Sequence, residues 1–220
     1  MHDEEFGHIH LVPSTRARRC VFRVADDGLL QVSVPPGATE ADVRRALEQL
    51  RPRLRPFIKR VAVRRSAGSE LVRQALAERG IADEMEALRQ RLNPQLIRPD
   101  ISPDQLRHLL LMAVLRQRAH RTFPSRLAEL ARQHGFSYRS LRINQSRTRW
   151  GSCSASGSIN LSLWLALLPP HLQDYTMLHE LCHTRHMDHS PQFWALLDSV
   201  CGGQNEALRR EQAQWVLSAL

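Results

Sequence analysis

The sequence lacks any apolar run of about 18 residues, the length that a helix needs to cross a bilayer. Its first ten residues, "MHDEEFGHIH", are acidic and have neither the basic region nor the apolar region of a signal peptide. The hydrophobic content of 42% over 220 residues is typical of a globular protein with a buried core. We therefore expect a cytoplasmic protein with no membrane partner.

Cysteine is scarce, and its four positions are far apart and form no C-x-x-C pair: Cys20, Cys153, Cys182 and Cys201. This spacing indicates neither a disulfide framework nor a cysteine-type zinc site. We expect the thiols to be reduced and mostly buried.

Lysine is almost absent, since Lys59 is the only one, although basic residues outnumber acidic residues by 31 to 22. A net charge of +9 would usually indicate a nucleic-acid partner, because clustered cations displace counterions from phosphates. A bias toward arginine can also arise from the base composition of the coding DNA. The charge alone therefore does not predict a nucleic-acid-binding surface.

The amino-terminal part predicts a β-hairpin followed by a helix. Residues 20–34, "CVFRVADDGLLQVSV", alternate apolar and polar side chains on both sides of the turn pair Asp27-Gly28. "PPGATEADVRRALEQL" then predicts a helix with Thr39 as its N-cap and Asp42 three residues later.

Residues 51–66, "RPRLRPFIKRVAVRRS", are rich in arginine and interrupted by Pro52 and Pro56. Prolines within a helix remove a hydrogen bond and clash with the preceding turn. The segment could be a linker, a basic arm or an irregular helix, and we favour the linker. We accordingly assign residues 1–66 to a hairpin-and-helix module with a basic linker.

The remaining residues, 67–220, predict a second domain of helices and short strands, so the expected fold class is α+β. Helical periodicity covers residues 69–92 and 103–119, with "NPQLIRPDISP" as a break, and "PSRLAELARQHG" predicts a short helix. Three extended pieces follow: "SYRSLRI", "SRTRWGSCS" and "INLSLWLALL". Three helices complete the chain: "PPHLQDYTMLHELCHTRH", a helix from Ser190 to Gly202-Gly203, and "NEALRREQAQWVLSAL".

The segment "HELCHTRHMDHSPQFW" holds four of the eleven histidines. His179 and His183 stand four residues apart, so on a helix both imidazoles project from one face and can share a zinc ion. Glu180 points about 100° away, where its carboxylate can act as a general base without being a ligand. Apolar neighbours on the same helix indicate that these polar groups are largely buried and need partners.

The third ligand is His189 or His186. The "SP" pair at Ser190 predicts a new helix, so the chain should turn after about His186 and carry His189 back toward the first two imidazoles. His186 lies on the same helical stripe as His183 and remains the rival. Three protein ligands and an open position are the pattern of a catalytic zinc site.

Residues 149–197 resemble the YgjP-like metallopeptidase family, which is related to the SprT-like zincins. The resemblance consists of HExxH, a third histidine after five further residues, the aromatic pair Phe193-Trp194, and "RWGSC" at 149–153. More loosely, the amino-terminal hairpin with its "VSVPPGA" exit also resembles the family's start.

The resemblance implies a zincin-like core, made of a small sheet and an active-site helix, in residues 67–220. It implies that His179, His183 and His189 are zinc ligands and that Glu180 is the general base. The "RWGSC" strand would then lie beside the site and pair with an extended peptide or protein substrate.

Several residues could support this chemistry. The candidates for stabilising an oxyanion are Tyr175, Tyr138 and Arg149. The candidates for accepting a hydrogen bond from an imidazole are Asp174, Asp188 and Asp198.

Two other functions remain open. Arg147 and Arg149 could grip the phosphates of a nucleotide whose phosphoanhydride the same zinc site hydrolyses. SprT-like relatives are associated with proteins attached to DNA, so that likeness implies that residues 51–65 could bind nucleic acid. A purely structural zinc site is a further possibility, which the three-ligand count and the glutamate disfavour.

Overall fold

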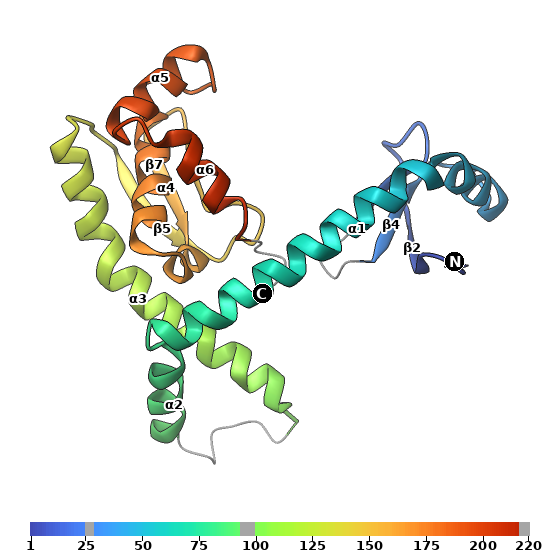
Figure 1. Ribbon diagram of the computed structural model, residues 1–220, viewed down its shortest axis with the longest axis horizontal. Coiled ribbons are helices and arrows are strands. Elements are labelled where there is room, and N and C mark those ends of the chain that lie inside the picture. Colours follow the sequence, from blue (N-terminus) through green and yellow to red (C-terminus); the bar gives the residue numbers. More distant parts are fainter. Residues whose placement is uncertain (25–28, 93–99, 216–220) are drawn as a thin grey trace. The chain divides into compact units, whose positions relative to one another are not determined.

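The computed structural model describes residues 1–24, 29–92 and 100–215, and it shows an α+β protein (Figure 1). The described chain divides into two compact units, Met1–Ser69 and Glu70–Leu217. Each unit contains a small mixed sheet with helices. No helix in the described ranges is both long and apolar enough to cross a membrane.

The first unit holds a four-stranded sheet in the order β1-β2-β4-β3. Its strands are β1 (His2–Asp3), β2 (Gly7–Pro13), β3 (Val21–Val24) and β4 (Leu30–Val34). β3 and β4 are antiparallel, as the hairpin prediction requires, and the predicted Asp27-Gly28 turn lies outside the described residues. β4 also pairs with β2 in parallel, which local patterning does not predict.

The core of this unit forms where the sheet packs on the first part of α1 (Glu40–Glu78). Its fully buried members come from β2, β4 and α1: Ile9, Leu30, Val32, Val43 and Leu47. The predicted N-cap is confirmed, because the Asp42 amide donates to Thr39 Oγ1 at 3.3 Å and the Thr39 amide donates to Asp42 Oδ2 at 2.9 Å.

The arginine-rich residues 51–66 are helical and belong to α1, so the prediction of a linker was wrong. Tertiary contacts explain why the helix continues through Pro52 and Pro56. Leu54 and Ile58 pack against the core of the first unit, and Arg51 and Arg55 bind carboxylates of the amino-terminal strands. These contacts outweigh the local penalty of proline.

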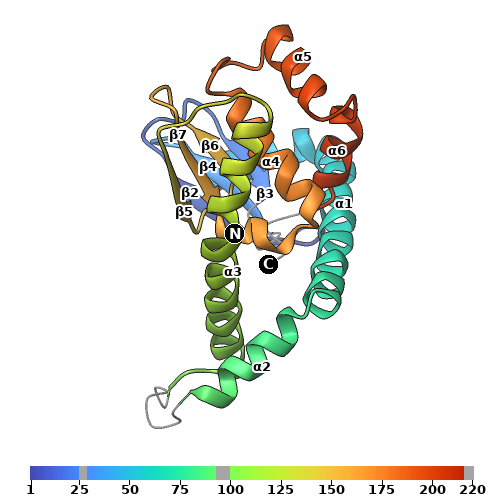
Figure 2. The ribbon, with the colours of Figure 1, turned by 90° about the vertical axis from the view of Figure 1, so that its left-hand side faces the viewer.

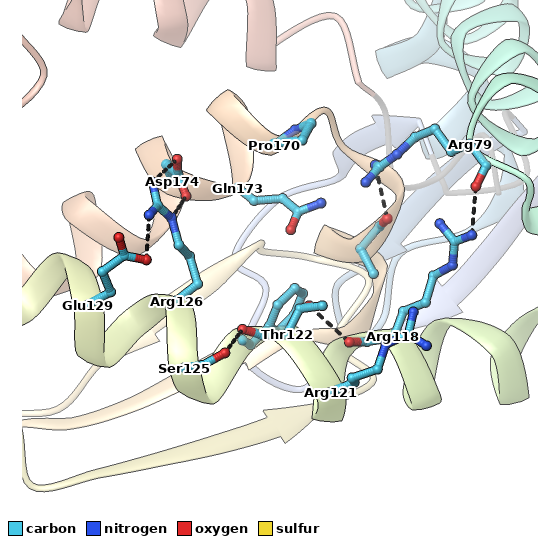
Figure 3. A pocket seen from close by; sticks show the side chains of 12 residues that line it. Arg79, Arg118, Arg121, Thr122, Ser125, Arg126, Glu129, Pro170, Gln173 and Asp174 are labelled. Atoms are coloured by element: carbon cyan, nitrogen blue, oxygen red, sulfur yellow. Dashed lines mark hydrogen bonds and ion pairs between the residues drawn. The ribbon is translucent and has the colours of Figure 1, made fainter.

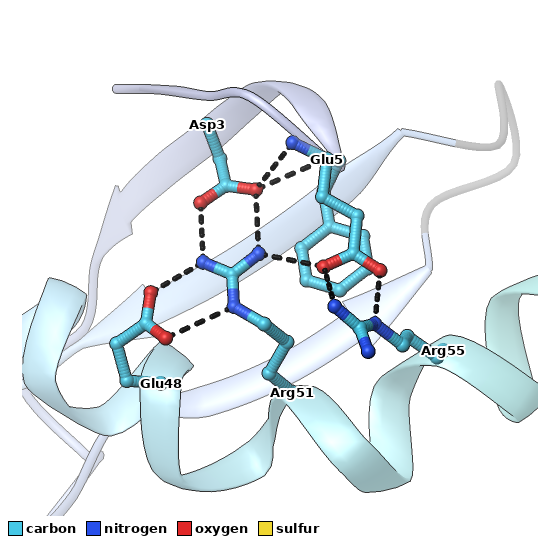
Figure 4. Close-up of polar contacts among 6 residues, drawn as sticks. Asp3, Glu5, Glu48, Arg51 and Arg55 are labelled. Carbon is cyan, nitrogen blue, oxygen red and sulfur yellow. Dashed lines mark hydrogen bonds and ion pairs between the residues drawn. The ribbon is translucent and has the colours of Figure 1, made fainter.

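Arg51 is the centre of an ion-pair cluster (Figure 4). It donates to Asp3 at 2.8 Å, to Glu5 at 2.8 Å and to Glu48, while Arg55 also binds Glu5. The hydrogen bond from Arg51 lowers the pKa of Asp3 from 3.8 to about 2. The two hydrogen bonds between Arg51 and Asp3 join β1 to α1. The Asp3 side chain is only 10% exposed, so water screens this pair weakly.

The second unit contains the end of α1, α2 (Ile81–Arg91) and α3 (Pro103–Gln133). The single helix predicted over residues 69–92 is instead interrupted at Gly80, whose φ of 64° suits glycine. The two helices predicted around Pro124 are one helix, since buried Phe123 and Leu127 continue the same apolar stripe across the proline.

A three-stranded sheet follows in the order β5-β7-β6. Its strands are β5 (Ser140–Asn144), β6 (Gly151–Cys153) and β7 (Ser158–Ser162). The predicted strand "INLSLWLALL" is only half correct, because residues Leu163–Leu167 form a buried 3₁₀ helix. Ser162 begins this helix by accepting a hydrogen bond from the Trp164 amide.

α4 (Pro170–Cys182) packs against β6, β7 and α3 (Figure 2). α5 (Pro191–Val200) begins at the predicted N-cap Ser190, whose hydroxyl accepts a hydrogen bond from the Phe193 amide. α6 (Asn205–Gln212) is shorter than predicted, and residues 216–220 lie outside the described part.

The Asp3–Arg51 pair makes the stability of the first unit depend on pH. Because the folded pKa of Asp3 is lowered, its contribution is present above pH 3.8 and is lost as the pH falls toward 2. We expect Asp3→Asn to destabilise this unit by about 1–2 kcal/mol at neutral pH. The difference should shrink below pH 3.8, measured as amide exchange in Leu30–Val34 corrected for intrinsic rates.

Glu4→Gln is the matched control, because Glu4 is exposed and the substitution makes the same charge change one residue away. We expect it to change protection by less than about 0.5 kcal/mol. Equal effects of the two variants would show that the pair with Arg51 does not stabilise the unit.

Candidate metal centre

α4 carries the first two histidines of the motif inside the second unit. Its apolar side chains Leu172, Leu178 and Leu181 are buried, as their spacing predicts. The helix ends at Cys182, earlier than predicted, but His183 retains an αR backbone as its C-cap. His179 and His183 therefore still project together from the end of the helix.

The turn after α4 brings His189 back to these two side chains. His179 Nε2 lies 3.2 Å from His183 Nε2 and 3.2 Å from His189 Nε2. One ligand atom from each of the three imidazoles lies within 4.8 Å of the others, so the group could hold a metal ion. A single Nε2 atom has either one proton or one lone pair and cannot satisfy two such contacts, whereas a cation can bind all three nitrogens.

His186 supports the cluster through its backbone. Its carbonyl oxygen lies 3.0 Å from His183 Nδ1, which fixes the proton on Nδ1 and leaves Nε2 free to bind a metal. Among the described residues, the group that could hold a metal ion contains His189 and not His186.

Two aromatic side chains from α5 surround the imidazoles. Phe193 is fully buried and stacks on His183, with ring centroids 4.4 Å apart and an interplanar angle of 25°. Its ring also lies 4.9 Å from that of His179 and 4.8 Å from that of His189. Trp194 is 5.3 Å from His189. The pair fixes the orientation of the rings and excludes water from one side.

Glu180 follows His179 in α4, and its side chain is buried. Glu180 is only 5% exposed. Within the described ranges, its Oε2 atom has no hydrogen-bond partner. A buried carboxylate oxygen without a partner is costly, and such groups are kept where they have a function.

Gly151 of β6 is the residue that makes room for this carboxylate. A Cβ atom at Gly151 would lie 2.6 Å from Glu180 Oε1 and 2.7 Å from its Cγ, closer than real Cβ contacts allow. The glycine of "RWGSC" therefore permits the glutamate to lie against the strand. Sequence reasoning placed this motif beside the site but missed the role of its glycine.

Burial controls the charge of the site. It lowers the pKa of His179 to about 3, with further lowering by His183 and His189, so this imidazole is neutral at physiological pH and able to bind a metal. Burial also lowers the pKa of His183. It raises the pKa of Glu180 to about 8, and the positive charge of Arg149 opposes this shift.

Several other candidate residues have partners elsewhere. Asp174 forms a bidentate pair with Arg126, with both distances 2.8 Å. Tyr175 donates to Asn205 Oδ1 at 3.1 Å, although its ring lies 6.4 Å from that of His179. In this structure, Asp174 therefore does not accept a hydrogen bond from an imidazole of the cluster, and the Tyr175 hydroxyl donates to Asn205 and not toward the cluster.

The remaining aspartates make their hydrogen bonds elsewhere. Asp198 accepts the Asn205 amide at 3.3 Å, and Asp188 is hydrogen-bonded to Ser190. The negative charge of Asp188 still acts on His183, where it opposes the larger lowering of the pKa by burial. No hydrogen bond or ring contact in the described part of the chain joins Tyr138 to the cluster. Cys182 is buried, and burial raises the pKa of its thiol to about 12, which fits a packed side chain.

A family model described as "YgjP-like, metallopeptidase domain" matches residues 18–211. The chain belongs to the YgjP-like family. The match includes the hairpin and α1 as well as the histidine segment, so it confirms the resemblance that "HELCH" and "RWGSC" indicate. No significant match was found among curated proteins or among solved structures.

The contact between Gly151 and Glu180 can be tested by a double-mutant cycle. We expect Gly151→Ala to destabilise this YgjP-like protein by about 1–3 kcal/mol, because the new methyl group overpacks the carboxylate. In a Glu180→Ala background the same change should cost less than about 0.5 kcal/mol.

Urea unfolding followed by tryptophan fluorescence measures this directly, since all four tryptophans lie in the second unit. An equal cost in both backgrounds would show that Gly151 is required for another reason.

Proposed function

We propose that this YgjP-like protein is a zinc-dependent metallopeptidase. His179, His183 and His189 would hold the ion, and Glu180 would act as the general base. The observation that carries the proposal is the convergence of three imidazole nitrogens at the end of α4, the helix that also carries the buried Glu180. The second unit would then be the zincin-like catalytic domain that we expect within residues 67–220.

The donor set fits zinc. Three neutral imidazoles are typical ligands of a catalytic zinc ion, at about 2.0–2.1 Å. Tetrahedral geometry with such bonds places two ligand nitrogens roughly 3.3 Å apart. The two separations from His179 Nε2 are 3.2 Å, and all three ligand atoms lie within 4.8 Å of one another. Three protein ligands leave one position for the reaction.

When bound, zinc would supply a Lewis acid that polarises a substrate carbonyl and acidifies a water molecule. Because burial raises the pKa of Glu180 to about 8, the positive charge of a bound ion would have to lower that pKa for the carboxylate to be ionised at neutral pH. The ionised Glu180 then accepts a proton from the attacking water as the water oxygen bonds to the carbonyl carbon. It returns this proton to the leaving amine as the C–N bond breaks. Its closeness to Gly151 keeps the carboxylate beside β6, the strand along which we expect the substrate to lie.

The sheet supports a peptide as the substrate. β6 is an edge strand in the order β5-β7-β6, so its outer backbone groups can pair with an extended chain. Such a substrate would lie next to Glu180, because Gly151 belongs to β6. We therefore expect unfolded or extended polypeptides to be cleaved in preference to folded proteins.

The two alternatives gain no such support. Arg147 lies over the Trp164 ring, with its guanidinium carbon 4.9 Å from the centroid, which is a packing role and not a phosphate grip. In the arginine-rich stretch, Arg51 and Arg55 are bound to carboxylates. Hydrolysis of nucleotides is therefore an outcome for the activity assay below to detect.

We expect the purified protein to bind about one zinc ion per chain, as measured by metal analysis without chelators. His189→Ala should lose the metal, with an affinity loss of at least about 100-fold, because it removes one of three ligands. His186→Ala is the matched control and should keep the metal, since His186 contributes its backbone carbonyl, which the substitution retains. Retention of zinc by His189→Ala would refute the proposed ligand set.

Glu180→Gln should separate metal binding from catalysis. The substitution keeps the size of the side chain and removes its ability to accept a proton, so we expect about one zinc per chain and a rate lower by about 10²–10⁴-fold. The assay follows cleavage of unfolded casein, with nucleoside triphosphates as parallel substrates. Nucleotide hydrolysis that needs Glu180 without any peptide cleavage would replace the proposed substrate.

A further inference from the structure

A pocket of about 490 Å³ lies in the second unit between the end of α1, the middle of α3 and the start of α4 (Figure 3). Its volume is typical of a small-molecule site. None of the three clustered histidines lines it. It is therefore a different site from the candidate metal centre, and its function does not depend on the proposed peptidase activity.

The walls of the pocket carry an excess of positive charge. The charged side chains that line it are four arginines and two acids: Arg79, Arg118, Arg121, Arg126, Glu129 and Asp174. Four cations against two anions leave a surplus of two positive charges on the lining. One further carboxylate, Glu84, is bound to Arg118 from outside the lining.

The charges are unevenly distributed along the pocket. At one end, Arg126 donates to both oxygens of Asp174 at 2.8 Å and to Glu129 at 2.7 Å, so its charge is fully compensated. The other three guanidinium groups gather at the opposite end, with Gln173 between the two ends (Figure 3).

Two of these three arginines have no carboxylate partner at ion-pair distance in the described part of the chain. Arg79 donates only through Nη1, to the backbone carbonyls of Ala166 at 3.1 Å and of Leu168. Arg121 is exposed, and within the same residues its side chain makes no hydrogen bond; its charge adds to the hydrogen bond from Arg118 in lowering the pKa of Glu84. The N–H groups on Nε and Nη2 of Arg79, and all five of Arg121, are therefore available to a ligand.

The positive charges at this end of the pocket are only partly compensated, because Glu84 pairs with Arg118 and no carboxylate of the described residues lies at ion-pair distance from Arg79 or Arg121. Arg118 Nη2 donates to the backbone carbonyl of Arg79 at 2.6 Å, which brings two guanidinium groups to one end of the pocket. Burial and the charge of Arg118 both lower the pKa of Arg79. An anion bound there would relieve this repulsion.

We propose that the pocket binds a phosphate group, as inorganic phosphate or as a phosphomonoester of a small molecule. Phosphate offers several oxygen atoms to several guanidinium forks at once, which a single carboxylate does not. The volume exceeds that of a phosphate ion, so the pocket also has room for the organic part of a phosphomonoester.

Calorimetric titration of the full-length protein with inorganic phosphate, and separately with ribose 5-phosphate, tests this proposal. We expect saturable binding with a dissociation constant of about 0.1–1 mM. Arg121→Gln should weaken it about tenfold, because it removes a charged donor whose side chain makes no hydrogen bond within the described residues. Its matched control is Arg116→Gln, an exposed position five residues earlier on α3 that does not line the pocket.

If phosphate instead binds at the histidine cluster, the two substitutions should change its affinity equally. Such binding cannot produce a difference between the variants. Weakening by Arg121→Gln alone would support the site, and the tighter of the two ligands would identify its form. Absence of saturable binding by either ligand, or equal affinities in the two variants, would overturn the proposal.

Discussion

The arrangement of the second unit depends on the burial of one carboxylate. Glu180 is 5% exposed, and its Oε2 atom has no partner in the described part of the chain. Removing a carboxylate from water is costly unless a positive charge or a hydrogen bond compensates. Three imidazole nitrogens converge at the end of the helix that carries Glu180, and together they could hold a metal cation that supplies a positive charge.

Three structural features keep the carboxylate and the imidazoles in place. Gly151 lacks the side chain that would displace Glu180 from β6. The carbonyl of His186 selects the proton position on His183, and Phe193 stacks on the same ring. Because these contacts come from β6, from the turn after α4 and from α5, the site needs the packing of several elements and not only the HExxH helix.

Features that depend on neighbouring residues could be predicted from the sequence. The N-caps Thr39 and Ser190 and the β3–β4 pairing follow local rules and are confirmed. The proximity of His179 and His183 follows from helical spacing alone. The proximity of His189 to these two histidines follows from the start of the next helix, whose N-cap is Ser190.

Features that depend on distant contacts could not be predicted in this way. α1 continues through Pro52 because Arg51 and Leu54 are held by the amino-terminal strands. The contact of Gly151 with Glu180 joins residues 29 positions apart, since 180 − 151 = 29, on different elements. The continuation of α1 and the contact at Gly151 both depend on residues that are close only in the folded protein. The periodicity of a single sequence does not show which distant residues those are.

X-ray absorption at the zinc edge of the purified protein identifies the atoms bound to the metal, and so tests the three-histidine site itself. We expect three imidazole nitrogens and one further light atom at about 2.0–2.1 Å, with no sulfur. A sulfur ligand at about 2.3 Å would place Cys182 or another thiol on the metal and contradict the three-histidine site.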